Sequence, residues 1–101
     1  MNSRGIEPSA PSSEAGVERI AIVDSQHASR IGLSHYLTGT CGLEIAWTVA
    51  SAEEALALVE HHEPDLLITE ISLPRKDGLA LIREILPSHP ELKILVHLFH
   101  S

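Results

Sequence analysis

The chain has 101 residues, of which 44% are hydrophobic, and its 14 acidic and 7 basic side chains give a formal net charge of −7. This length accommodates one small domain with a packed core, and the ordinary charged fraction of 21% argues against wholesale disorder. Because only two lysines are present, Lys76 and Lys93, the sequence offers no basic stripe for binding nucleic acid or an anionic membrane.

The start of the chain and its cysteine content indicate the cellular compartment in which we expect the protein. Residues 1–17 are rich in Pro and Ser, and we expect them to be a disordered tail, either a linker or a start-site artefact. They do not resemble a signal peptide, and the single Cys41 has no partner for an internal disulfide. No stretch approaches the roughly 18–20 apolar residues of a membrane span. We therefore expect a cytoplasmic protein.

Strand and helix patterns alternate in the first half of the remaining chain. The apolar run Arg19–Val23 predicts a strand. Residues 26–37 carry apolar side chains at helical spacing, and Gly39 and Gly42 are expected to break the chain after them. Alternating apolar residues then predict a second strand over 43–50.

A capping box predicts the second helix. The Ser51 side chain is expected to accept an N–H of the first turn, and Glu54 is expected to bond back to the start of the helix. The residues expected to face inward are Ala55, Leu56 and Val59.

The third and fourth strands flank a third helix. Residues 65–69 are almost wholly apolar, which is typical of a strand buried on both faces. A loop with the turn pair Asp77-Gly78 leads to a helix over 79–86, and residues 93–98 predict the fourth strand. The expected core stripe of this helix is Leu79, Ile82, Ile85 and Leu86.

Strands separated by helices of this length imply parallel pairing through right-handed crossovers, and hence an α/β fold, a three-layer α/β/α sandwich with a parallel sheet. Chemistry in such sheets collects beyond the carboxyl ends of the strands. Asp24 and Glu70 follow the first and third strands and are therefore the candidate pair. The residues after the first strand fit neither a P-loop nor a dinucleotide fingerprint, which argues against nucleotide chemistry.

These patterns resemble a response-regulator receiver domain of the CheY-like kind, most closely the receivers that precede a helix-turn-helix in LuxR-type transcription factors. The resemblance covers residues 19–101 and rests on the acidic end of the first strand, on PDLLITEISLPRKDGL and on HPELKILVHLFH. It implies the strand order 2-1-3-4-5. Residues 18–101 would then be an atypical and incomplete receiver, truncated after the fourth strand, without strand five and helices four and five.

The resemblance also implies a phosphorylation site, from which this chain departs. Of the acidic pair that holds Mg²⁺ in the family, Asp24 is kept, but its neighbour is Ser25. Glu70 stands at the phospho-acceptor position in place of aspartate, and Leu98 stands at the Ser/Thr switch position. The lysine that follows strand five in the family is absent.

What remains is expected to bind metal weakly. The residual Mg²⁺ ligands would be Asp24, Glu70 and Ser72, and no other cofactor is expected. The longer Glu70 is poorly placed for in-line attack in a site built around aspartate. The residues of the surrounding site loop are Ser25, Pro74, Asp77 and Gly78.

The leading hypothesis is therefore a non-enzymatic receiver in bacterial transcription regulation, phosphorylation-independent and acting through protein contacts. One alternative is a conventional Mg²⁺-dependent phospho-acceptor, and another is a degenerate pocket that binds a small metabolite. Glu70 as a mimic of phosphorylated aspartate, and a decaying domain without any switching role, also stay open. A hydrolytic enzyme is least favoured, because no Ser/His/Asp order or nucleophile elbow is visible.

The predicted fourth strand forms an open, apolar edge without proline. The favoured interpretation is that the chain is a piece of a longer regulator, which contacts DNA only through a helix-turn-helix outside this sequence. The other is that a partner or a second copy completes the edge, giving a homodimer. The seven histidines form no ligand motif, and the ring of His97, in an apolar strand, is expected to be neutral.

Overall fold

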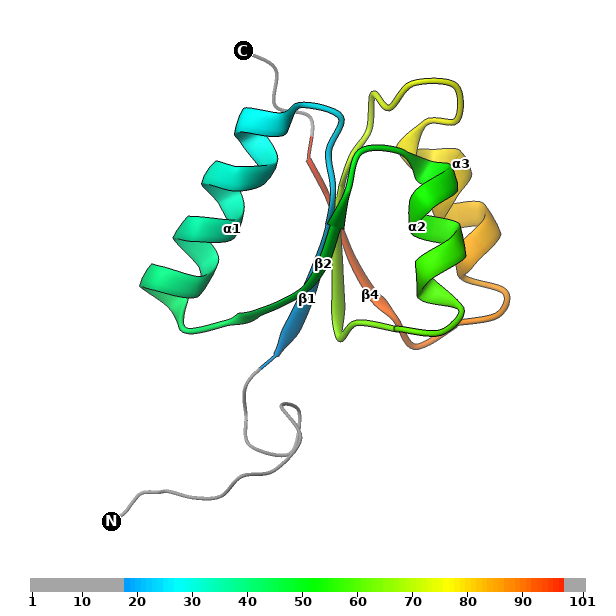
Figure 1. Ribbon diagram of the computed structural model, residues 1–101. Coiled ribbons are helices and arrows are strands. Elements are labelled where there is room, and N and C mark those ends of the chain that lie inside the picture. Colours follow the sequence, from blue (N-terminus) through cyan, green and yellow to red (C-terminus); the bar gives the residue numbers. More distant parts are fainter. Residues whose placement is uncertain (1–17, 98–101) are drawn as a thin grey trace.

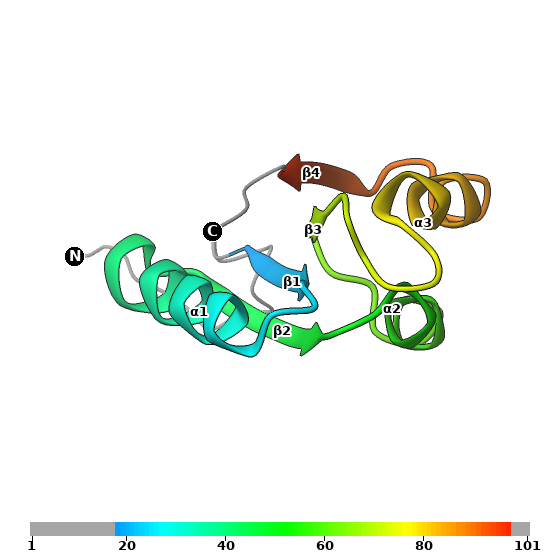
Figure 2. The same cartoon turned by 90° about the horizontal axis from the view of Figure 1, so that it is seen from above.

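The computed structural model describes residues 18–97, which form a parallel sheet with helices on both faces (Figure 1). The sheet order is β2-β1-β3-β4, and each neighbouring pair is parallel. Seen from above, α1 covers one face, whereas α2 and α3 lie on the other (Figure 2). In chain order the elements are β1 (Arg19–Val23), α1 (His27–Cys41), β2 (Glu44–Val49), α2 (Ala52–Val59), β3 (Leu66–Glu70), α3 (Gly78–Ile85) and β4 (Lys93–His97). The predicted three-layer fold is confirmed.

Two separate cores hold the layers together. On the α1 face, Ile20 and Ile22 of β1 and Ile68 of β3 pack against partly buried leucines of α1. On the opposite face, Ala21 and Val23 belong to the larger core with α2 and α3. Because successive side chains of a strand point to opposite faces, the central strand β1 is buried on both sides.

The first helix is longer than predicted. Gly39 lies inside α1 and does not break it, because a lone helical glycine costs only about 1 kcal/mol. The helix ends at Gly42, whose φ of 69° is the left-handed conformation that glycine adopts without strain. Cys41, which lies between these two glycines, is the last helical residue and is exposed.

The predicted capping box of α2 is confirmed at its serine. The Ser51 side chain accepts a hydrogen bond from Glu54 N at 3.2 Å. Glu54 Oε1 accepts from Ala50 N, also at 3.2 Å, one residue ahead of the cap. Ala55 and Val59 are buried as expected, whereas Leu56 is only partly buried.

The core stripe predicted for α3 is wrong at both ends. Leu79 and Leu86 are 44% and 37% exposed, and the buried apolar side chains are Leu81 and Ile85. The helix carries two apolar stripes, and the one with Leu81 and Ile85 faces the core because Gly78, on the same face, packs against the backbone at the end of β3. The second stripe, Leu79, Ile82 and Leu86, lies largely outside the core.

The strands begin and end within one residue of their predicted bounds wherever the structure describes them. The predicted tail, residues 1–17, and Leu98 lie outside the described residues. Within residues 18–97, no helix combines the length and the apolar character needed to cross a membrane.

Candidate functional site

The two predicted acidic residues meet at the carboxyl edge of the sheet. Asp24 follows β1 directly and Glu70 is the last residue of β3. Because β1 and β3 are parallel neighbours, both side chains emerge at the same edge. Asp24 is only 3% exposed and Glu70 only 5%. Two carboxyl groups are thus buried side by side.

Glu70 is held by the turn that follows β1. Its Oε1 accepts hydrogen bonds from Ser25 N at 2.6 Å and from Ser25 Oγ at 2.7 Å. Burial alone would raise the pKa of Glu70, but these two bonds, with smaller contributions from Asp24 and His97, outweigh it and hold the pKa below its ordinary value. The Ser25–Glu70 contact therefore stabilises a charged carboxylate at the acceptor position.

The pKa of Asp24 is shifted in the opposite direction from that of Glu70. Its Oδ1 accepts a hydrogen bond from Gln26 N at 2.8 Å, which fixes the turn into α1. Burial raises the pKa of this carboxyl above its ordinary value, and the neighbouring charge of Glu70 adds to the rise. The backbone oxygen of Asp24 accepts from Arg30 Nη1 at 2.8 Å, so the arginine binds the main chain and not the carboxylate.

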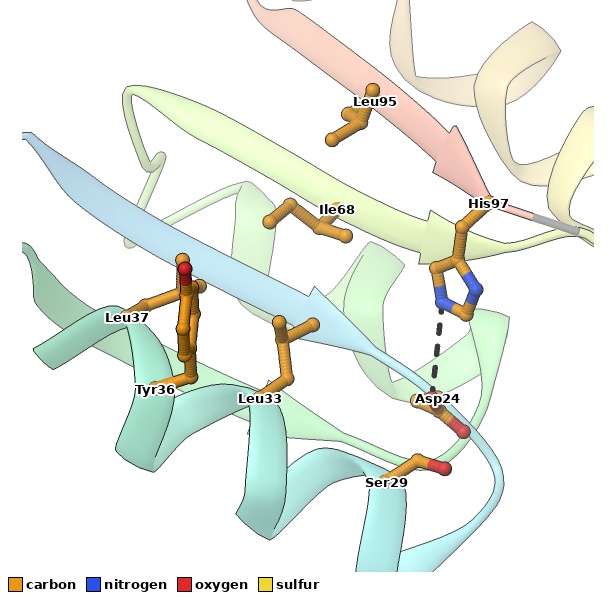
Figure 3. A pocket seen from close by; sticks show the side chains of 8 residues that line it. All are labelled: Asp24, Ser29, Leu33, Tyr36, Leu37, Ile68, Leu95 and His97. Atoms are coloured by element: carbon orange, nitrogen blue, oxygen red, sulfur yellow. Dashed lines mark ion pairs between the residues drawn. The ribbon is translucent and has the colours of Figure 1, made fainter. Parts of the chain in front are cut away.

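His97 joins this pair from the end of β4. Its Nε2 lies 3.8 Å from Asp24 Oδ2, and the ring points toward the carboxylate (Figure 3). This nitrogen is buried and makes no hydrogen bond within the described residues. Sequence reasoning noted the ring but did not assign it to the site. The register of a parallel strand beside β3 is the signal that places it there, since His97 pairs with Glu70.

An apolar groove adjoins the acidic pair on the α1 face. The groove has a volume of about 490 Å³. Figure 3 shows its apolar side chains between α1, β3 and β4, with Asp24 and His97 at one end. We call it the α1–β4 groove, and it is lined by Asp24, Ser29, Leu33, Tyr36, Leu37, Ile68, Leu95 and His97.

The residues present do not fit a Mg²⁺ ion. One oxygen of Glu70 is occupied by both donors of Ser25, and Ser25 itself stands where a second carboxylate would be needed. Ser72, the third proposed ligand, is an exposed residue of the loop after β3. Between residues 18 and 97, no group of three or more His, Cys, Asp or Glu side chains is arranged to hold a metal ion.

The predicted site loop has clear structural roles. Asp77 caps α3, because its Oδ1 accepts from Ala80 N at 2.8 Å. Gly78 N donates to Ile71 O at 2.9 Å, and a Cβ at this glycine would lie only 2.5 Å from Glu70 O. Pro74 is exposed in the same loop. The loop thus packs directly on the backbone that carries Glu70. The switch position, Leu98, lies outside the described residues.

Comparisons with known proteins agree with this geometry. A family model described as the response regulator receiver domain matches residues 20–100. The transcriptional regulatory protein YhcZ of Bacillus subtilis, itself described as uncharacterized, is 31% identical over 78 residues, which are 77% of this chain and 36% of that protein. The response regulator GacA of Pseudomonas viridiflava is 30% identical over 77 residues, which are 76% of this chain and 36% of that protein.

A solved structure shows the same fold. The two-component response regulator of the LuxR family from Aurantimonas sp. SI85-9A1 superposes with a TM-score of 0.78 at 26% identity, covering 84% of this chain and 61% of that one. This chain spans little more than a third of the length of the two curated relatives, so the match concerns one domain of each.

Proposed function

Because the chain belongs to the response regulator receiver family of two-component signalling, we propose that it is an atypical receiver that works without phosphorylation, through contacts with other proteins. The observation that carries this proposal is the Ser25–Glu70 contact, in which both donors of Ser25 bind one oxygen of the acceptor-position side chain.

The contact opposes phosphoryl transfer to Glu70. In-line attack requires a free nucleophilic oxygen within about 3–3.5 Å of phosphorus, and a misplacement near 1 Å can cost on the order of 100-fold in rate. The two bonds from Ser25 to Oε1 instead fix the orientation of the whole Glu70 carboxylate toward the turn after β1, so its other oxygen, Oε2, cannot turn freely toward a phosphoryl donor. The missing second carboxylate removes charge stabilisation that a bound Mg²⁺ would supply.

The same contact favours one fixed conformation. Hydrogen bonds from Ser25 keep the pKa of Glu70 below its ordinary value despite burial, so the side chain is ionised at neutral pH. Its charge is directed to Ser25 of the same domain. A charge changes an equilibrium only when it contacts the two states differently, so we propose a constitutive state and not a mimic of phosphorylation.

The rest of the proposal concerns the whole protein. The relative YhcZ is named a transcriptional regulatory protein, and we propose the same broad role for the protein to which this domain belongs, in the bacterial cytoplasm. We propose that DNA contacts belong to a separate helix-turn-helix and that protein contacts belong to this domain. No catalytic role is proposed for the domain.

One observation favours a second candidate function. The α1–β4 groove, at about 490 Å³, falls within the range of roughly 300–1,000 Å³ that is usual for small-molecule sites, and its walls are largely apolar. A metabolite-binding domain therefore remains the alternative. It predicts saturable amide shifts at Leu33, Ile68 and Leu95 during titration with a small apolar ligand.

Phosphotransfer provides the test of the main proposal. The chain is incubated with Mg²⁺ and acetyl phosphate, and the intact mass is followed over time, with Glu70→Gln as the matched control. We expect identical spectra without a phosphoryl adduct. An adduct on the wild-type chain that is absent from the Glu70→Gln variant would overturn the proposal.

A further inference from the structure

Hydrogen bonds join the turn after β1 to the end of β3. The two strands are parallel neighbours, with Val23 paired to Thr69, so the residues that follow in both strands leave the sheet at the same edge. At this edge Ser25 N and Ser25 Oγ donate to Glu70 Oε1 at 2.6 and 2.7 Å. The side chain of Glu70 therefore connects the two segments by hydrogen bonds alone.

The carboxyl oxygens at this edge are largely occupied by the protein itself. Glu70 Oε1 accepts both bonds from Ser25, and Asp24 Oδ1 accepts one from Gln26 N at 2.8 Å. Asp24 Oδ2 faces the ring of His97, whose Nε2 lies 3.8 Å away (Figure 3). Because Asp24 and Glu70 are almost fully buried, little water reaches them, whereas Mg²⁺ requires octahedral oxygen ligands and usually keeps several waters among them.

From this arrangement we propose that the Ser25–Glu70 contact joins the two segments between which the receiver family holds Mg²⁺, and that Ser25 is the residue that excludes the ion. The domain then keeps its acidic edge in one conformation without a divalent cation. This inference rests on the phosphorylation-independent role proposed above and names the contact that makes the site independent of metal.

Ser25 has two properties that exclude a cation. Its side chain is uncharged, so the turn after β1 supplies the single carboxyl group of Asp24, and its two donors occupy the Glu70 oxygen that a cation would bind. Ser25 is also exposed, so a carboxylate at this position would be open to ions from the solvent. Ser25→Asp removes the hydroxyl donor and brings a like charge to Glu70, which disfavours the charged forms of both groups. This one change should therefore create a junction that requires Mg²⁺.

Thermal unfolding with and without Mg²⁺ tests the proposal. The wild-type chain, Ser25→Asp and Ser25→Asn are unfolded in EDTA and in increasing MgCl₂, at an ionic strength held constant with NaCl. Ser25→Asn is the matched control, because asparagine has the size of aspartate without its charge. In EDTA we expect Ser25→Asp to melt at a lower temperature than Ser25→Asn. Its melting temperature should rise saturably with Mg²⁺ by about 5 °C or more, since a ligand that binds only the folded state stabilises it, whereas wild type and Ser25→Asn should not respond.

A second measurement uses the wild-type chain alone. Mn²⁺ takes the same oxygen ligands as Mg²⁺, and because it is paramagnetic it broadens the amide signals next to its site. We expect the amides of Asp24, Ser25 and Glu70 to broaden no more than that of Glu44, an exposed acidic residue at the opposite end of the sheet. This measurement does not depend on the folding of any variant.

A wild-type melting temperature that rises with Mg²⁺ at constant ionic strength would overturn the inference, and so would selective Mn²⁺ broadening at Asp24 and Glu70. A folded Ser25→Asp variant that ignores Mg²⁺ would also refute it, because another residue would then exclude the cation. If Ser25→Asp does not fold, the manganese experiment on the wild-type chain decides. A wild-type chain that binds Mg²⁺ but acquires no phosphoryl adduct refutes this inference alone, since the acetyl phosphate experiment tests the proposed function separately.

Discussion

Two buried carboxyl groups, those of Asp24 and Glu70, lie side by side, and their pKa values are shifted in opposite directions. Burial raises the pKa of Asp24, whereas Ser25 lowers that of Glu70 despite burial. Hydrogen-bond donors contribute to the difference, because Glu70 receives two from Ser25 and Asp24 receives one from Gln26, and the two carboxyl groups also shift each other in opposite directions. Ser25, the residue next to Asp24, thus favours the charged form of Glu70.

Asp24→Asn is expected to stabilise the fold at neutral pH. Asparagine keeps an oxygen for Gln26 N and removes a buried charge beside Glu70. Because the folded-state pKa of Asp24 is raised, its penalty is absent below the unfolded value near 3.8 and complete above the folded value. Urea unfolding should show a gain on the order of 1 kcal/mol at pH 7, since each pKa unit corresponds to about 1.4 kcal/mol. The gain should vanish in acid, and an equal gain at both pH values would contradict this assignment.

Ser25→Ala is expected to have the opposite effect. It removes the hydroxyl donor to Glu70, and a hydrogen bond to a charged group contributes about 1.5–3 kcal/mol. Because the folded pKa of Glu70 is lowered, the lost stability should be present above the unfolded value of 4.5 and should shrink as pH falls through the folded value. Ser72→Ala, at an exposed serine, is the control and should leave unfolding unchanged. Equal loss in both variants would argue against the Ser25–Glu70 contact.

At the scale of elements, the first residue of α3, Gly78, packs against the backbone of Glu70 at the end of β3. The N–H of Gly78 donates to Ile71 O, and a Cβ at this position would lie 2.5 Å from Glu70 O and 3.0 Å from Ile71 Cα. These are backbone atoms, so an added methyl group forces the helix away from the end of β3. Helix packing and site geometry are therefore coupled at one glycine.

Gly78→Ala should destabilise the fold by about 1–3 kcal/mol, the usual effect of overpacking, in spite of the better helix propensity of alanine. Gly39→Ala is the matched control inside α1, where an added Cβ meets nothing within 4 Å. This control should stabilise the fold by about 0.5–1 kcal/mol. Thermal unfolding of both variants checks the pair, and a neutral Gly78→Ala would show that the loop accommodates the methyl group.

Local sequence patterns predicted most of the helices and strands. The predictions were wrong where the position of a side chain depends on contacts between distant parts of the chain. The Ser51 cap and the glycine end of α1 at Gly42 depend on neighbouring residues only, so the sequence displays them. The buried face of α3 depends on a tertiary contact, the packing of Gly78 against the backbone of Glu70, which makes Leu81 the buried residue in place of Leu79. The placing of His97 beside Asp24 needs the order of three strands, which no local pattern contains.

At the scale of the whole molecule, the fold is that of a receiver with two acidic side chains at the carboxyl edge of its sheet. The central strands bring Asp24 and Glu70 together as the family fold implies, and the match to the family covers residues 20–100. Ser25 and Glu70 are hydrogen-bonded to each other at this edge. The central claim is that this edge no longer responds to a phosphoryl group.

The most direct test of that claim is an amide NMR titration of the chain with Mg²⁺ and then beryllofluoride, which stands in for the phosphoryl group. The account predicts a well-dispersed spectrum in which the amides of Ser25, Glu70 and Ser72 do not move. Saturable shifts at these amides that extend into β4 would contradict it, because they would show that the site still binds a phosphoryl analogue and transmits the change across the sheet.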